Sequence, residues 1–405
     1  MAFITKFHYG YVIVFCCCLI MGINIGLVMS CAGIFYKPVS SELGVSLGDF
    51  GLYMTFIYLF STLMLSIAGK LIDKYSARWL LTLSSAILGL VFLGMSTFYS
   101  VWQFYVAGAF IGLSLAFLLY LSYPTLVNRW FNSNVGFFIG ICSAASGIGG
   151  VIFNPFGGYL IANYGWRTTY LIFGAIILIF VTPLLALLLR NYPADKGLKS
   201  LGEKQTETVK TGVNYSIAIK MPVFYSLIAF AFLMISVSTL NLFMPTYVTS
   251  VGFSLEQSAF VASAIMLGVT IGKVVLGWIN DKNTLFGVST SVGLGIIGLI
   301  FLLLGKSGML IMTAGGFLFG WAYAGVTVET ALLVRTVFGS KDYAKIFSNI
   351  SIALAAGGAI MSGGWGYLTD FINFKYILIT AIALLVMSGI VAFYAIGVSR
   401  KFIKM

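Results

Sequence analysis

Charged residues are scarce in this sequence of 405 residues. They make up 8% of the chain, whereas hydrophobic residues make up 60%. A soluble domain carries roughly 25% charged residues, so this composition excludes a protein that water surrounds on all sides. The apolar residues fall in runs of about 20 or more, the length that crosses a ~30 Å hydrocarbon layer. The sequence therefore predicts an integral membrane protein.

Histidine and the motifs of soluble enzymes are also missing or nearly so. His8 is the only histidine, and the sequence shows no Cys/His metal spacing and no histidine-based triad. The sequence has no Gly-x-x-x-x-Gly-Lys-Ser/Thr loop for ATP and no cluster of carboxylates. We therefore expect no enzyme, no cofactor and no metal. The five cysteines all lie in apolar runs, where we expect their small side chains to pack between helices: Cys16, Cys17, Cys18, Cys31 and Cys142.

Acidic residues are outnumbered by basic ones, 11 to 23, and the net charge is +12. In a soluble protein this excess would suggest nucleic acid as a partner. Here the basic residues lie between the apolar runs, where lysine and arginine contact anionic lipid headgroups. We therefore expect the lipid bilayer, and not nucleic acid, as the partner of these charges.

The apolar runs number about twelve, and one long polar stretch, 190–222, separates the sixth from the seventh. Its lysines, glutamates, threonines and glycines indicate a flexible linker. We expect an all-α protein with twelve transmembrane helices: an N-terminal six-helix bundle (1–190), a linker (191–222) and a C-terminal six-helix bundle (223–405). The predicted helices lie near 10–35, 46–68, 79–98, 101–127, 135–160, 169–189, 223–250, 256–279, 286–304, 309–335, 345–369 and 374–398.

The positions of lysine and arginine test this count. If both termini are cytoplasmic, 18 of the 23 basic residues fall on the cytoplasmic side. The positive-inside rule requires such a bias, and an odd number of helices would scramble it. We expect a monomer in the plasma or inner membrane of the cell, with both termini and the linker in the cytoplasm.

The two halves of the sequence match each other at a constant offset of 208 residues. This offset moves each helix six places and preserves its direction, as in the parallel repeats of transporters whose halves rock about a central site. Glycine pairs in the fifth and eleventh helices would let helices pack closely and slide, although static packing explains them equally well. Four groups align: Gly44-Val45-Ser46 with Gly252-Phe253-Ser254; Gly69, Asp73 and Lys74 with Gly277, Asp281 and Lys282; Gly149-Gly150 with Gly357-Gly358; and Gly158-Tyr159-Leu160 with Gly366-Tyr367-Leu368.

The loop after the second helix reads Gly69-Lys70-Leu71-Ile72-Asp73-Lys74-Tyr75-Ser76-Ala77-Arg78. It is similar to the loop signature of the major facilitator superfamily, Gly-x-Leu-x-Asp-Arg/Lys-x-Gly-x-Arg/Lys, with Ser76 in place of the second glycine. The helix count, the linker and the repeat extend the resemblance over essentially the whole chain. The resemblance implies that one conformational state is stabilised by this loop and its equivalent, namely by Gly69, Asp73, Lys74, Arg78 and Asp281.

Two interpretations of Asp73 are open. Its carboxylate could form charge-assisted pairs with Lys74 and Arg78 across a moving seam. Alternatively, Asp73 could simply cap a helix.

A narrower resemblance is to the monocarboxylate-porter and oxalate–formate antiporter branch. It rests on Phe35-Tyr36-Lys37, on Arg129-Trp130-Phe131 with the later Gly140, Ala144, Ser146 and Gly149, and on Tyr164-Gly165-Trp166-Arg167. Several of the branch's functional positions differ. Ser30 replaces a first-helix lysine, Lys273 replaces an eighth-helix arginine, and Val269 replaces the acid one turn earlier. The resemblance implies a small organic anion as solute but no particular one.

Two ionisable side chains are expected inside helices. Lys273 lies in the eighth helix and Glu329 in the tenth, each some ~9 Å from the cytoplasmic end at ~1.5 Å per residue. An ionised group at the bilayer centre costs at least ~2.5–3.5 kcal/mol, so each is a functional hypothesis. Because the resemblance implies that these helices are neighbours, we expect a Lys273–Glu329 pair.

The pair has a functional and a structural interpretation. Lys273 would attract the solute's carboxylate, and Glu329 would compete for it or carry a proton, which would couple transport to pH. Alternatively, the pair would be a structural salt bridge. Arg129 and Arg335 lie closer to helix ends, where we expect them to reach the headgroups.

Polar and aromatic side chains also lie on the first, fourth, seventh and tenth helices, which the resemblance implies line a central cavity. The sequence predicts a secondary active transporter of a small organic, monocarboxylate-like anion, driven by protons or by exchange. An exporter of amphiphilic or cationic compounds and a non-transporting solute sensor are the alternatives. Besides Lys273, we expect five residues to contact the solute: Asn24, Tyr120, Tyr123, Asn241 and Tyr323. Alternatively, these side chains would form hydrogen bonds between helices.

Overall fold

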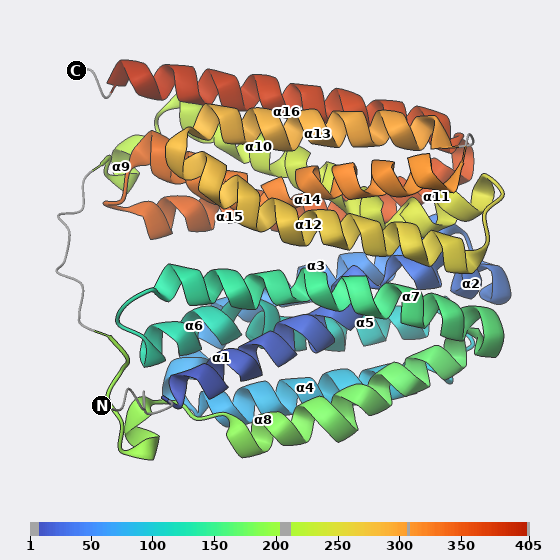
Figure 1. Ribbon diagram of the computed structural model, residues 1–405, viewed down its shortest axis with the longest axis horizontal. Helices are drawn as coiled ribbons and strands as arrows, with labels where there is room; N and C mark the ends of the chain where they lie inside the picture. The colour runs from blue at the N-terminus through green and yellow to red at the C-terminus, as the bar shows by residue number, and fades with distance from the viewer. Residues whose placement is uncertain (1–7, 203–211, 306–307, 403–405) are drawn as a thin grey trace, which may run out of the picture.

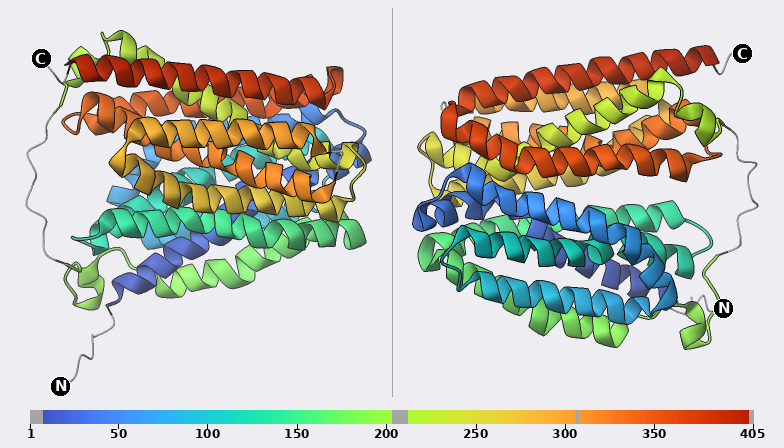
Figure 2. Two further views of the ribbon diagram at one scale, coloured as in Figure 1. Left: turned by 45° about the horizontal axis from the view of Figure 1, so that its top comes forward. Right: turned by 180° about the vertical axis from the view of Figure 1, so that it is seen from behind.

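The computed structural model describes residues 8–202, 212–305 and 308–402. These residues form two bundles of long helices that lie side by side, α1 to α8 in one and α10 to α16 in the other (Figure 1; Figure 2). The start of α1, the end of α16 and the short elements η4 and α9 of the linker lie at one end of the molecule. We call it the linker end, and the opposite one the far end.

Six helices cross the first bundle, and several of them change pitch along their length. A π-helical stretch interrupts the first, fourth and sixth of them, and α7 contributes to both the fifth and the sixth. In chain order they are α1 (Gly10–Leu19) with η1 (Ile20–Ser30) and α2 (Gly33–Leu43); α3 (Leu47–Lys74); α4 (Ala77–Met95); α5 (Val101–Leu115) with η2 (Ala116–Leu121) and α6 (Ser122–Trp130); α7 (Val135–Ala175); and η3 (Ile176–Val181) with α8 (Thr182–Leu188).

Six further helices cross the second bundle, after two short linker elements, η4 (Pro193–Lys196) and α9 (Tyr215–Ala218). Among the described residues of these six helices, a change of pitch occurs in the seventh helix only, at η5. In chain order they are α10 (Pro222–Ser238) with η5 (Thr239–Phe243) and α11 (Met244–Ser250); α12 (Leu255–Lys282); α13 (Thr284–Leu303); α14 (Met309–Phe338); α15 (Tyr343–Phe371); and α16 (Phe374–Phe402).

The fifth and sixth helices meet at Gly165. By length and composition, the described residues hold 11 helices that could span a membrane, and the longest is Val135–Leu188, with 54 residues. At ~1.5 Å per residue such a helix would be far longer than a bilayer is thick. It is broken at Gly165, whose φ of 79° and ψ of 163° are not helical and are accessible mainly to glycine. The structure therefore confirms the predicted twelve-helix, all-α membrane fold.

The glycine pair of the fifth helix has two different neighbours. A Cβ added at Gly149 would meet the carbonyl oxygen of Gly22 in the first helix of the same bundle. A Cβ added at Gly150 would meet Met266 of α12, in the other bundle, as well as Ser30 of its own bundle. One glycine therefore permits close packing within the bundle, and the other permits close approach across the seam between the bundles.

The glycine pair of the eleventh helix repeats this division. A Cβ at Gly357 would meet Ile235 of α10 in the same bundle, whereas a Cβ at Gly358 would meet the ring of Tyr58 in the first bundle. The internal repeat therefore preserves packing roles, since each glycine and its equivalent 208 residues later face corresponding helices.

The linker is attached to equivalent loops of the two bundles. Leu201 pairs with Phe131, after the fourth helix, and Gly212 pairs with Gly339, after the tenth. Phe131 and Gly339 are separated by the same 208 residues as the repeat. Each bundle therefore binds the linker through an isolated backbone bridge at the equivalent loop, parallel in the first bundle and antiparallel in the second.

Substitution of Gly149 tests the close packing of the first and fifth helices. Gly149→Val should lower the midpoint of thermal unfolding by several degrees, because overpacking a well-packed site costs about 1–3 kcal/mol. Gly140→Val, on the same helix, is the matched control because a Cβ there meets nothing within 4 Å. Equal melting of the two purified variants in detergent would contradict the packing described here.

Candidate functional site

Lys273 lies in the seam between the bundles. Its Nζ is 3.5 Å from the Oγ of Ser143 on α7, in the opposite bundle. Val274 and Trp278 of the same helix are 64% and 61% exposed and mark the outer face of α12. The Lys273 ammonium therefore points across the seam and away from the surface that would meet lipid.

A tyrosine of the fourth helix joins this contact. Tyr123 of α6 lies beside Ser143, so helices four, five and eight bring Tyr123, Ser143 and Lys273 together. Two hydroxyl groups and one ammonium form a polar cluster in an otherwise apolar region. Hydroxyl and ammonium groups are the donors that a carboxylate accepts hydrogen bonds from.

Glu329 lies in a separate place, and the predicted Lys273–Glu329 pair is wrong for this conformation. Each residue is nine positions from the linker end of its helix, so the predicted similarity in depth holds. However, the Glu329 side chain is fully buried and accepts a hydrogen bond from Nδ2 of Asn280 on α12 at 3.0 Å. In residues 8–202, 212–305 and 308–402 the ion pairs are Arg129–Asp73 and Arg167–Glu42.

A small pocket of about 10 Å³ lies between helices one, two, seven and ten. It contains two of the residues predicted from the sequence, Asn241 and Tyr323. Sequence reasoning missed the other residues that line it, because helix two was not expected to contribute and the methionines and hydroxyls carried no motif: Met29, Met54, Tyr58, Ser238, Thr239 and Leu242.

Tyr120 lies close to this pocket, and Asn24 does not. The Tyr120 side chain is 38% exposed, and its hydroxyl lies near that of Tyr58. Asn24 is buried inside the first bundle, where Nδ2 donates to Oγ of Ser85 on α4 at 3.0 Å. Ser85 in turn contacts Thr182 of the sixth helix at 3.1 Å. Asn24 therefore connects three helices of one bundle, which is the alternative to contact with the solute.

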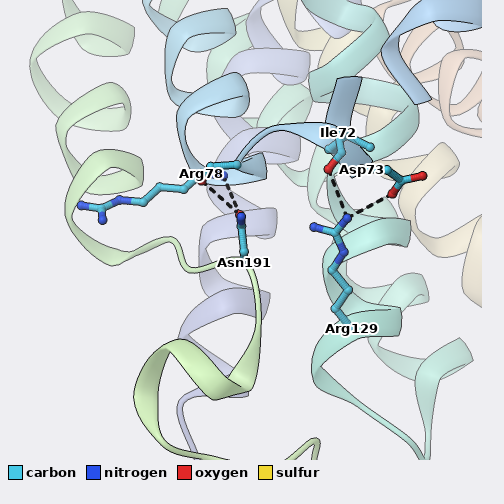
Figure 3. A network of polar contacts seen from close by, with 6 residues as sticks. Ile72, Asp73, Arg78, Arg129 and Asn191 are labelled. Carbon is cyan, nitrogen blue, oxygen red and sulfur yellow. Dashed lines mark hydrogen bonds and ion pairs between the residues drawn. The ribbon is translucent and has the colours of Figure 1, made fainter. Parts of the chain in front are cut away.

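The loop after the second helix forms a different ion pair from the ones predicted. Asp73 pairs with Arg129 of α6, with a distance of 3.3 Å between Oδ1 and Nη2, and the same nitrogen donates to the carbonyl of Ile72 at 3.2 Å (Figure 3). Arg129 thus contacts protein, whereas the sequence suggested that it reaches headgroups. The Asp73 side chain is 80% exposed, and exposed pairs contribute only about 0–1 kcal/mol.

The two basic residues expected to pair with Asp73 lie elsewhere. The Lys74 ammonium is 5.4 Å from the centroid of the Tyr75 ring. The Arg78 guanidinium donates to the carbonyl of Ala186, and its backbone N–H donates to Asn191 at 3.0 Å (Figure 3). Arg78 therefore fastens the start of the third helix to the end of the sixth.

The linker contacts the same arginine. The guanidinium of Arg129 lies 4.7 Å from the centroid of the Tyr192 ring, and Ser200 donates to the Arg129 carbonyl at 3.1 Å. Arg129 therefore joins the second helix, the fourth helix and the linker.

Two further residues that were predicted to stabilise one conformation, Gly69 and Asp281, make few contacts. A Cβ at Gly69 would meet nothing within 4 Å. Asp281, the counterpart of Asp73, is exposed and forms no ion pair with any residue that the structure describes. Its neighbour Lys282 lies 3.7 Å from the centroid of the Trp278 ring. The second bundle therefore keeps the sequence of this loop without its ion pair.

The bundles are joined at the far end. Asp370, at the end of α15, accepts the N–H groups of Leu47 and Gly48, at 3.2 and 3.1 Å. It thereby caps the first turn of α3 in the other bundle, where a negative charge is favourable. Tyr36 and Phe243 add an edge-to-face aromatic contact across the same seam, with ring centroids 4.9 Å apart. These contacts close the far end of the path between the bundles.

Comparison with known families agrees with this architecture. A model described as Major Facilitator Superfamily matches residues 14–314. The chain belongs to the major facilitator superfamily. It is accordingly a multi-pass membrane protein of a transporter family.

Distant relatives within the superfamily include carriers of organic acids. The transporter is 26% identical over 201 residues to monocarboxylate transporter 12 of Rattus norvegicus. That match covers 44% of this chain, and the chain spans 41% of the length of the rat protein. The transporter is also 24% identical over 319 residues to the cis,cis-muconate transport protein of Acinetobacter baylyi (strain ATCC 33305 / BD413 / ADP1), with 72% of this chain and 75% of that protein covered.

A solved structure shares the fold. A bacterial homologue of the human lysosomal transporter Spinster, in an inward-facing and unoccupied conformation, matches with a TM-score of 0.74. The match covers 98% of both chains at 17% sequence identity. At this identity the similarity establishes the fold alone.

Removal of the Asp370 cap tests the closure of the far end. Asp370→Ala should increase several-fold the rate at which a membrane-impermeant thiol reagent labels Asn241→Cys from the far side. A loss of about 1 kcal/mol of closure energy changes the equilibrium between closed and open states about fivefold. The measurement uses a background in which the native cysteines are replaced.

Glu256→Ala is the matched control, because Glu256 is an exposed acid in the first turn of α12. It should leave the labelling rate unchanged. If Asp370→Ala labels no faster than this control, the cap does not hold the far end closed.

Proposed function

We propose that this transporter carries a small organic anion, of the monocarboxylate type, and that Lys273 binds its carboxylate. The ammonium of Lys273 lies in the seam between the bundles without an acid within ion-pair distance, in the part of the chain that the structure describes. Isolated charges in a low-dielectric interior are costly, and opposite charges offset that cost. A carboxylate beside Lys273 would supply the missing charge, and Ser143 and Tyr123 would add hydrogen bonds.

The side chains around the small pocket at helices one, two, seven and ten suit the rest of such a solute. Met29, Met54, Tyr58 and Tyr323 offer apolar and aromatic surface, and Asn241 offers an amide. Methionine adapts to irregular apolar shapes, and aromatic rings pack against planar groups. An anion with a hydrocarbon or unsaturated body would therefore be favoured over an inorganic one.

The two relatives named for organic acids support the same class of solute. Both matches are distant, so they support a carboxylate in general and no specific compound. An exporter of cationic compounds is the second candidate because of the methionine and tyrosine side chains. No acidic residue is among those that line the pocket, and a bound cation would require one, so we favour the anion.

Alternating access would move the solute. We infer that the linker end faces the cytoplasm of the cell, since 18 of the 23 basic residues then lie inside. With the far end closed, the conformation described here would be the one that faces inward. Rocking of the two bundles about the seam would expose Lys273 to each side in turn, driven by a proton gradient or by exchange.

Substitution of Lys273 tests the proposed anion site. Lys273→Ala and Lys273→Glu should each reduce the uptake of lactate, benzoate or muconate into proteoliposomes at least tenfold, because the counter-charge for the carboxylate is lost. Lys273→Arg should retain part of the uptake. Lys282→Glu is the matched control, since Lys282 lies at the end of the same helix beside Trp278.

The variants distinguish a role of Lys273 itself from a general effect of charge on α12. Uptake by Lys273→Glu equal to that of the unmodified protein would reject the role of Lys273. A loss of uptake that Lys282→Glu shares to the same degree would show that reduced charge on α12, and not the position of Lys273, is responsible.

A further inference from the structure

His8, the single histidine of the sequence, lies just before the first helix and contacts the linker. Its Nε2 is 3.0 Å from the carbonyl oxygen of Lys199, and its Nδ1 accepts the N–H of Gly10 at 3.1 Å. A backbone N–H only donates and a carbonyl only accepts. In this arrangement Nδ1 therefore carries no proton, and Nε2 carries the proton that Lys199 accepts. The two contacts together require a neutral imidazole in one tautomer.

The linker stretch that His8 contacts is attached to the end of the fourth helix. Leu201 donates its N–H to the carbonyl of Trp130 at 2.9 Å, and its own carbonyl accepts the N–H of Asn132 at 2.8 Å. The Trp130 ring also lies edge-on to the imidazole of His8, with centroids 6.2 Å apart. We call these contacts of residues 199–202 the first attachment. His8 thus packs on the helix that holds the first attachment and bonds directly to the linker within it.

A second proton on His8 is opposed by its position. That proton would lie on Nδ1 and face the N–H of Gly10, so that two donors would meet where a donor and an acceptor meet now. The imidazolium would also lie at the N-terminal end of α1, where a positive charge is unfavourable. The ring is partly exposed, so water can bring the proton to it. Protonation therefore breaks the contact with Gly10 and turns the ring out of its present place.

The charged groups of the elements around His8 add to this effect. The acid of linker residues 190–202 is Asp195, which accepts the N–H groups of Asn191 and Tyr192 at 2.9 and 3.1 Å. The Tyr9 hydroxyl donates to the carbonyl of Leu188 at 2.7 Å. The other charged residues of the linker stretch and of the fourth helix end are cations, which repel an imidazolium: Arg129, Arg190, Lys196 and Lys199.

We propose that His8 is a proton-operated latch for the linker. Neutral His8 holds the linker on the first bundle, and protonation of His8 releases it. Histidine is the side chain that ordinarily changes its charge between about pH 5 and pH 8. The first attachment is therefore complete at the upper end of this range and is lost as the pH falls through it. The inference goes beyond the proposed function, because the latch requires neither a solute nor Lys273.

The second bundle holds the other end of the linker without a histidine. There Val213 donates its N–H to the carbonyl of Phe338 at 2.9 Å, and Tyr215 donates its N–H to Oδ2 of Asp342 at 2.8 Å. We call these contacts the second attachment. Because His8 is the only histidine of the sequence, acidity that protonates histidine acts on one end of the linker and leaves the other in place.

Release of the first attachment lengthens the chain that connects the bundles. Leu201 and Gly212 are 11 residues apart, so with both attachments closed this chain spans at most about 40 Å. Without the first attachment it begins at Gly197, after η4, and 15 residues then separate it from Gly212. These reach about 54 Å when fully extended. Acid at the linker end therefore relaxes a limit on how far the bundles separate there.

Hydrogen–deuterium exchange of the purified protein, followed by mass spectrometry, tests the latch. The peptides that contain Leu201 and Asn132 should exchange about fivefold faster at pH 5.5 than at pH 7.5, the effect expected for one lost hydrogen bond. Rates at each pH are divided by the chemical exchange rate of the unstructured peptide. The peptide that contains Val213 should show no such change, and it reports in the same sample whether the protein is folded.

Three variants assign the effect to the imidazole. His8→Gln should protect Leu201 at both pH values, because a glutamine side chain stays neutral and offers both a donor and an acceptor. His8→Ala should leave Leu201 in fast exchange at both. Lys199→Gln is the matched control and should keep the pH dependence of the unmodified protein, since Lys199 contributes its backbone carbonyl.

Three results would overturn the latch. The first is equal protection of Leu201 at the two pH values in the unmodified protein. The second is a pH dependence that His8→Gln retains. The third is an equal change at Val213, which would show that acid loosens the whole linker end.

Discussion

The contact between α7 and α12 joins the two bundles, and it brings the Lys273 ammonium to Ser143 across the seam. The approach is close because Gly147 and Gly150 on α7 leave room for Thr270 and Met266 of α12. Side chains with a Cβ would separate the helices and admit lipid or water. The chemistry of the seam therefore depends on small residues that hold a cation in a place of low dielectric constant, where an opposite charge has a large effect.

The repeat explains the frame of the transporter but not its charges. Gly149, Gly150 and their equivalents 208 residues later have corresponding neighbours. In contrast, Lys273 and Glu329 correspond to Leu65 and Leu121. The two bundles thus share a scaffold that can rock, while the ionisable groups inside helices that we consider functional lie in the second bundle. This division is what a parallel duplication permits, because one copy can change its chemistry while both keep their packing.

The sequence was sufficient to predict which segments form helices, but not which side of each helix faces which neighbour. Apolar length predicted the spans, and Gly165 ends the fifth helix near where the pattern did. The same reasoning placed Lys273 and Glu329 at equal depth but could not tell that one faces α7 and the other Asn280. Rotation about a helix axis depends on pitch, and the π-helical stretches η1 and η2 alter it. Asn24 lies in η1 and Tyr120 in η2, so their directions could not be predicted from a regular period. Asp73 was likewise assigned to basic residues near it in sequence, whereas its partner Arg129 comes from another helix.

The central claim is that an unpaired cation in the seam selects an anionic solute. A thermal-shift screen of the purified protein tests it most directly, with monocarboxylates, dicarboxylates, hydrophobic amines and peptides compared at two pH values. A ligand that binds only the folded state, at a hundredfold excess over its dissociation constant, adds about 2.7 kcal/mol to the free energy of unfolding. The account predicts that carboxylates raise the midpoint by several degrees and that amines do not. Stabilisation by hydrophobic amines, with no effect of any carboxylate, would contradict it.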